Sequence, residues 1–122
     1  MTGILITGGA GYIGSHIVEL LNSNKNHVII LDNLSTGHKK LIYKKASFIK
    51  GDIKNINLLK KIIIDYNIQT VIHLAAYLNV SDAEKSKAKY YKNNIIGTKN
   101  LVFACKNSNV KNFIFSSSCS IY

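Results

Sequence analysis

Runs of apolar and β-branched residues, each about as long as a strand, alternate with amphipathic helical patterns along the whole chain. Such uninterrupted apolar runs are typical of strands buried on both faces of a parallel sheet. We expect strands at 3–7, 28–31, 47–50, 70–74 and 113–115. We expect helices at 12–24, from a cap at Asn55 or Asn57 to Tyr66, and at about 84–107. The alternation therefore predicts one α/β domain over residues 1–122, with right-handed crossovers.

Apolar spacing also predicts which faces of the two later helices are buried. In the helix that ends near Tyr66, the expected face carries Ile56, Leu59, Ile63 and Tyr66. In the last helix, the expected face carries Tyr91, Ile95, Thr98, Val102 and Cys105.

The junction between the first strand and its helix carries a glycine pattern with a chemical meaning. Gly9, Gly11 and Gly14 satisfy G-x-G-x-x-G, and Asp32 closes the next strand 18 residues after Gly14. In this context the pattern predicts dinucleotide binding, because a bend without side chains lets pyrophosphate approach the free N–H groups of a helix start. Asp32 can accept hydrogen bonds from ribose hydroxyls and would repel a 2′-phosphate, which favours NAD over NADP. The alternative, that Asp32 only caps a loop, stays open.

Composition narrows the remaining function classes. The chain carries a net charge of +10, but every basic residue is Lys and no lysine run exceeds two residues. Without Arg, sequence-specific nucleic-acid recognition is disfavoured. No apolar run approaches the roughly 20 residues of a membrane span. Cys105 and Cys119 form no disulfide or metal pattern, so we expect reduced thiols in a cytoplasmic protein.

Further short motifs follow in a fixed order: Leu-Asp-Asn-Leu at 31–34, Gly-Asp-Ile at 51–53, His-Leu-Ala-Ala at 73–76, Tyr-Tyr-x-Asn-Asn-x-x-Gly-Thr at 90–98 and Phe-Ser-Ser-Ser at 115–118. Together with the glycine-rich run at 7–16, they resemble the extended short-chain dehydrogenase/reductase family, in particular its NAD-dependent nucleotide-sugar epimerases. The resemblance covers the whole chain. It implies a Rossmann-type, doubly wound sheet with five parallel strands in the order 3-2-1-4-5 and helices on both faces.

The resemblance also implies roles for individual residues. The pyrophosphate would be held by the glycine-rich turn and the start of its helix, namely Gly8, Gly9, Gly11, Tyr12, Ile13 and Gly14. The adenosine half would be held by Asp32, Asn33 and Ser35, with Asp52 and Ile53 flanking the adenine. Ala75 and Ala76 would let NAD lie against the backbone, and Asn94 would face the same side. Ser118 would be the catalytic serine that bonds the sugar O4, unless it only ends a strand.

The implied reaction interconverts UDP-galactose and UDP-glucose through a 4-keto sugar, with transient hydride transfer to NAD. The family's catalytic Tyr-x-x-x-Lys motif follows the fifth strand, and the chain ends before it; Tyr90, Tyr91 and Tyr122 do not fit the motif. We therefore expect an incomplete NAD-binding domain without a substrate domain, inactive alone. A UDP-sugar would bind only if the missing part is supplied, and the family's homodimer is not assured. We also expect that, without the helix and strand that follow the fifth strand in this family, the domain exposes an apolar patch and an unpaired sheet edge. Both features favour association with other chains.

Several features leave alternatives open. Leu78 stands where epimerases often carry a Lys beside the cofactor, which leaves the substrate open. The chain could be an isomerase part, a non-catalytic NAD-binding remnant, or part of a related dehydratase or reductase; Cys119-Ser120 disfavours a dehydratase. The four histidines lack metal-ligand spacing, so we expect no metal site. We expect a hydrogen-bonded core position for His73, and surface or helix-start positions for His16, His27 and His38.

Overall fold

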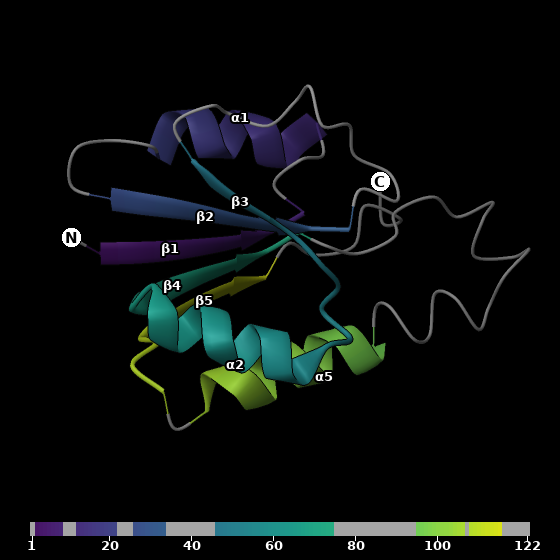
Figure 1. The fold of residues 1–122 in the computed structure, drawn as a ribbon. Coiled ribbons are helices and arrows are strands. Elements are labelled where there is room, and N and C mark those ends of the chain that lie inside the picture. Colours follow the sequence, from purple (N-terminus) through teal and green to yellow (C-terminus); the bar gives the residue numbers. More distant parts are fainter. Residues whose placement is uncertain are drawn as a thin grey trace, which may run out of the picture.

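The computed structural model describes residues 2–8, 12–21, 26–33, 46–74, 95–106 and 108–115. These residues build one five-stranded parallel sheet in the order β3-β2-β1-β4-β5, which confirms the predicted order (Figure 1). The strands are β1 (Thr2–Thr7), β2 (Asn26–Asp32), β3 (Ser47–Lys50), β4 (Ile68–His73) and β5 (Asn112–Phe115). The predicted strands are all present, and β1, β2, β4 and β5 begin one or two residues earlier than the apolar runs indicate.

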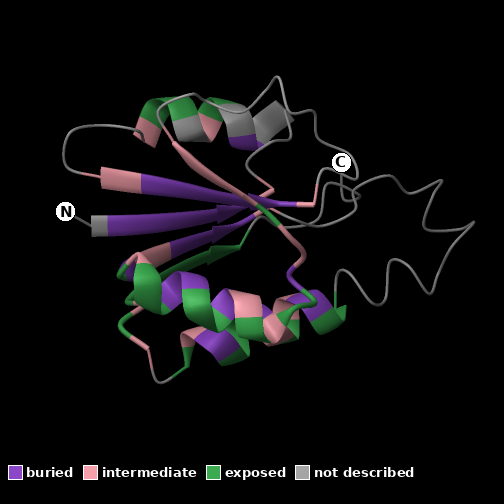
Figure 2. Cartoon of the chain, viewed as in Figure 1, coloured by how far each residue is buried: buried purple, intermediate pink, exposed green. Residues whose placement is uncertain are grey.

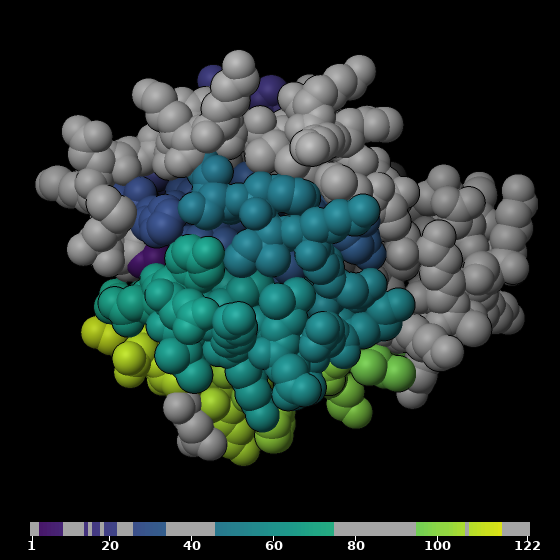
Figure 3. All heavy atoms as spheres, viewed as in Figure 1, coloured from purple at the N-terminus to yellow at the C-terminus, as the bar shows by residue number. Residues whose placement is uncertain are grey.

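Helices cover both faces of the sheet, as predicted. The helix α1 (Tyr12–Leu21) lies on one face, and α2 (Ile56–Asp65) and α5 (Gly97–Cys105) lie side by side on the other (Figure 1). In the space-filling view, residues 46–74 form most of the described surface on the side of α2, with α5 and β5 below them (Figure 3). No helix among the described ranges combines the length and the apolar character that crossing a bilayer requires.

Successive residues of the central strands alternate between two cores. Leu5 and Ile29 belong to the larger cluster beneath α2 and α5, whereas Ile4, Ile6 and Ile30 belong to the smaller cluster on the side of α1. The central strands are therefore buried on both faces, as the apolar runs predict (Figure 2).

The edge strand β5 departs from this pattern. All four of its residues are exposed, including Phe113, Ile114 and Phe115, and within the described residues β5 pairs only with β4. An exposed strand of apolar side chains is a surface on which another chain segment can associate.

The helix α2 is flanked by two asparagines, Asn55 before it and Asn67 after it. The side chain of Asn55 accepts a hydrogen bond from the Leu58 N–H at 3.2 Å, so Asn55 is the cap and Asn57 is not. Beyond the helix, Asn67 adopts a φ of 49°, a left-handed conformation that asparagine tolerates at a helix end. The buried residues are Leu59, Ile62 and Ile63. The predicted face therefore missed Ile62, and its end members Ile56 and Tyr66 are only half-buried.

The predicted buried face of α5 is wrong in part, because only Thr98 and Cys105 among its described members are half-buried. Ile95 and Val102 are about half exposed (46% and 50%), and the buried residues are Gly97, Leu101 and Ala104. The buried face carries two small residues, which allow the helix backbone to approach the core closely. A prediction from apolar residues alone selected the neighbouring face. Tyr91 and the expected start of this helix lie outside the described residues.

We predict that Asn55→Ala lowers the free energy of unfolding by about 1 kcal/mol, because an N–H in the first turn of α2 loses its acceptor. Asn57→Ala is the matched control, since Asn57 is an exposed residue in the same turn and is not the cap. Urea unfolding followed by circular dichroism measures both variants. Equal effects of the two substitutions would contradict the assignment of the cap.

Candidate functional site

The candidate site is the edge of the sheet at which the parallel strands end. In register, Thr7 of β1 lies beside Leu31 of β2 and beside His73 of β4, and Asp32 lies beside Lys50 of β3. The residues that follow these strands therefore meet at one edge. In open α/β sheets, this carboxyl edge is where ligands bind.

Gly8 makes the turn that leaves β1. Its φ is 81°, in the left-handed region that favours glycine, and its N–H donates to the Leu31 carbonyl oxygen at 2.9 Å. The helix α1 begins soon afterwards, at Tyr12, and Gly14 in its first turn is buried. A left-handed glycine between a buried strand and a helix start is the arrangement by which backbone N–H groups receive a phosphate.

Asp32 closes β2 beside this turn. It is 8% exposed, and its carbonyl oxygen accepts a hydrogen bond from the Gly51 N–H at 3.1 Å, which joins the end of β2 to the segment after β3. The predicted acid is therefore next to the glycine turn, on the strand that pairs with β1.

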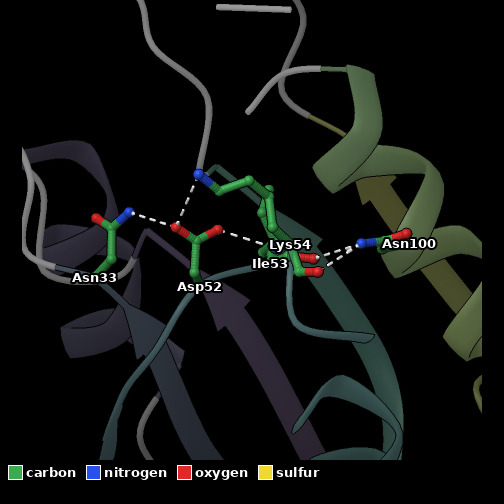
Figure 4. Close-up of polar contacts among 5 residues, drawn as sticks. All are labelled: Asn33, Asp52, Ile53, Lys54 and Asn100. Atoms are coloured by element: carbon green, nitrogen blue, oxygen red, sulfur yellow. Dashed lines mark hydrogen bonds and ion pairs between the residues drawn. The ribbon is translucent and has the colours of Figure 1, made fainter. Parts of the chain in front are cut away.

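A second acid, Asp52, is held by three contacts (Figure 4). The Asn33 side-chain amide donates to its Oδ2 at 3.2 Å, and the Lys54 backbone N–H donates to its Oδ1 at 2.9 Å. The Lys54 ammonium lies 3.6 Å from Oδ2. The sequence placed Asn33 and Asp52 in one site, and the structure brings them together.

Ile53, the residue after Asp52, is buried, whereas Asp52 is partly exposed. The Ile53 side chain is 3% exposed and belongs to the larger hydrophobic cluster. It therefore offers little surface on which an adenine ring could pack, and its carbonyl oxygen accepts a hydrogen bond from the Asn100 side chain at 3.4 Å.

His73, at the end of β4, is buried and hydrogen-bonded on both ring nitrogens. Its Nδ1 lies 2.6 Å from the Thr7 hydroxyl oxygen, and its Nε2 lies 2.9 Å from the Thr98 hydroxyl oxygen. The Leu74 N–H also donates to the Thr7 hydroxyl, at 3.1 Å. Burial lowers the pKa of His73 to about 4, so the ring is neutral at pH 7. The predicted core position of His73 is confirmed, and the bonds join β1, β4 and α5.

The structure also describes three other residues for which the sequence made a prediction, namely His27, His16 and Cys105. His27 lies within β2 rather than at the surface or a helix start; it is half-buried, and its Nε2 lies 2.9 Å from the Ser47 hydroxyl. The prediction for His27 is therefore wrong, whereas His16 is exposed as expected. The Cys105 thiol is free, and burial raises its pKa to about 11. Among the described residues, no group of three or more His, Cys, Asp or Glu side chains could hold a metal ion.

Seven of the predicted site residues lie outside the described residues: Gly9, Gly11, Ser35, Ala75, Ala76, Asn94 and Ser118. Tyr12 and Ile13 are described only by their place at the start of α1. Three residues without a predicted role also contact this edge, namely Thr7, Thr98 and Asn100. Thr7 and Thr98 belong to quoted motifs and could have been found. No local signal marks Asn100, whose partners are 46 and 47 residues away.

Comparison with known proteins is consistent with this geometry. Residues 4–122 match the model of the NAD dependent epimerase/dehydratase family. The chain belongs to this family. It is 46% identical to a UDP-glucose 4-epimerase from Lactobacillus helveticus, over 98% of this chain and 36% of that protein. The chain thus spans little more than a third of the length of that relative.

Solved structures of relatives show the same fold. The UDP-glucose 4-epimerase from Brucella ovis, solved in complex with NAD, matches 100% of this chain and 37% of its own at 40% identity, with a TM-score of 0.91. The enzyme from Thermotoga maritima, solved with UDP-glucose, matches 95% of this chain and 38% of its own at 39% identity, also with a TM-score of 0.91. The family and the fold implied by the sequence motifs are therefore confirmed.

We predict that His73 remains neutral down to about pH 5. Because its pKa is lowered from 6.5 to about 4, its contribution to stability is complete above about pH 6.5 and is lost as the pH falls toward 4. The loss amounts to about 3 kcal/mol. NMR titration of the histidine ring protons measures the pKa of His73 directly.

A His73 resonance that titrates above pH 6 would contradict the buried, neutral ring.

Proposed function

We propose that this chain binds NAD at the carboxyl edge of its sheet and forms the cofactor-binding part of a UDP-glucose 4-epimerase. The observation that carries the proposal is the left-handed turn at Gly8, between β1 and α1, beside Asp32 at the end of β2. The described residues fit a dinucleotide, because a backbone turn suited to pyrophosphate and a carboxylate suited to ribose lie on neighbouring strands.

The pyrophosphate and the adenosine half of the cofactor would each meet a defined group of this chain. Backbone N–H groups at the start of α1 would hold the pyrophosphate, where the helix dipole favours negative charge. Asp32 would accept hydrogen bonds from the adenosine ribose. Asp52 would accept one from the adenine amino group. A bound nicotinamide supplies reversible hydride transfer, which is the chemistry that inversion at the sugar C4 requires.

We further propose that the 122-residue chain does not convert UDP-sugars alone. None of its seven tyrosines is followed by Lys at the fourth position, so the family's Tyr-x-x-x-Lys base is not found within this sequence. The same observation supports the second candidate function, a non-catalytic NAD-binding protein. Three further proposals rest on the family alone. Ser118 and Asn94 have the roles predicted above, a complete protein binds UDP-glucose and UDP-galactose, and the protein is located in the cytoplasm.

We predict that the chain binds NAD more tightly than NADP, because the Asp32 carboxylate repels a 2′-phosphate. Asp32→Asn should weaken NAD binding about tenfold or more, since hydrogen bonds to a charged group are worth roughly 1.5–3 kcal/mol. It should leave NADP binding unchanged or improved. Isothermal titration calorimetry measures both cofactors.

Asp65→Asn is the matched control, because Asp65 is an exposed acid at the far end of α2. Equal affinity of the unmodified chain for NAD and NADP would contradict the assigned role of Asp32. No binding of NAD at millimolar concentration would contradict the proposed function itself.

We predict that the purified chain, incubated with NAD and UDP-galactose, forms no UDP-glucose, because it carries no Tyr-x-x-x-Lys base. Chromatography of the nucleotide sugars measures the product, with a full-length UDP-glucose 4-epimerase as the positive control. Turnover by the chain alone would show that another of its residues acts as the base.

A further inference from the structure

The first turns of α5 are in direct contact with the segment that carries Asp52. The Asn100 side-chain amide donates to the carbonyl oxygen of Lys54 at 2.9 Å and to that of Ile53 at 3.4 Å (Figure 4). One amide group thus contacts two consecutive carbonyls on a segment nearly fifty residues away in the sequence.

The backbones also approach closely one turn before Asn100. Gly97 is buried against the Ile53 side chain, and a Cβ added to Gly97 would overlap the Cδ1 and Cγ1 atoms of Ile53. Because Ile53 is itself packed in the core, it has little freedom to move away. The position of α5 relative to residues 52–54 is therefore fixed.

The contact with Ile53 bears directly on the Asp52 carboxylate. The Ile53 carbonyl and the Lys54 N–H belong to the same planar, trans peptide group, so they point in opposite directions. Asn100 binds the carbonyl side of this peptide, and the N–H side donates to Asp52 Oδ1 at 2.9 Å. Orientation of the peptide by Asn100 therefore orients the donor that holds the carboxylate.

The Asp52 carboxylate retains room for a ligand. A carboxylate offers about four acceptor positions. Among the described residues, Oδ2 is contacted by Asn33 and by the Lys54 ammonium, and Oδ1 is contacted by the Lys54 N–H alone. Oδ1 can accept one further hydrogen bond, and an exocyclic amino group on a purine is a suitable donor.

We propose that Asn100 is a positioning residue for recognition of the base. It fixes the 53–54 peptide and thereby aims the free acceptor position of Asp52 Oδ1 at the purine amino group. This inference rests on the proposed binding of NAD. It predicts that Asn100, which need not touch the cofactor, sets the preference for a 6-amino over a 6-oxo purine.

The test compares NAD with nicotinamide hypoxanthine dinucleotide, in which an oxo group replaces the adenine amino group. We expect the unmodified chain to prefer NAD. Asn100→Ala should reduce this preference about fivefold, by loosening a hydrogen bond that selects the amino group. Asn100→Asp, which has the same shape but no N–H donors, should behave in the same way.

Asn112→Ala is the matched control, because Asn112 also donates a side-chain amide hydrogen bond, to Thr70 at 3.4 Å, at the opposite end of the sheet. It should leave the preference unchanged. If Asn100→Ala weakens both dinucleotides equally, its role is only structural and the proposal is overturned.

Hydrogen exchange separates this proposal from the proposed function. Without cofactor, the Lys54 amide should exchange several-fold faster in Asn100→Ala than in Asn112→Ala, because the 53–54 peptide that carries this N–H is no longer held against the Asp52 carboxylate. Unchanged exchange at Lys54 would overturn the positioning role even if NAD binds. Faster exchange in a chain that binds no NAD would support the positioning of Asp52 and overturn the proposed function alone.

Discussion

The parallel pairing of β1 between β2 and β4 is the constraint on which the rest of the structure depends. Thr7 ends β1 in register with Leu31 on one side and His73 on the other. This register brings the Gly8 turn, Asp32 and the Thr7–His73 contact to one edge of the sheet. A shift of one residue in either pairing would also exchange the two buried faces of a strand. The buried side chains of the central strands therefore fix the position of the candidate site.

Two groups of contacts join α5 to this edge. Thr98 reaches the His73 ring, whose other nitrogen meets the Thr7 hydroxyl just before the glycine turn. Asn100 reaches the segment that carries Asp52. A single short helix is thus bonded to both the region expected to hold pyrophosphate and the region expected to hold adenine. Close approach at Gly97 makes both groups of contacts possible.

Much of the fold could be predicted from the sequence because its signals are local. Apolar runs marked every strand, and strand order followed from the resemblance to a family. The glycine pattern and Asp32 indicated the candidate site because each lies at the end of a strand. The buried face of α5 and the contacts of Asn100 could not be predicted in this way. They depend on close packing at Gly97 and on partners distant in the sequence, which local periodicity does not encode.

The central claim is that the carboxyl edge of this sheet holds NAD. Titration of NAD into the isotope-labelled chain, followed by amide NMR spectra, tests it most directly. The account predicts that shifts concentrate at Gly8, at 32–33 and at 52–54, while amides at the opposite edge, such as Asn26 and Asn112, stay unchanged. Shifts confined to that opposite edge, or no shifts at saturating NAD, would contradict it.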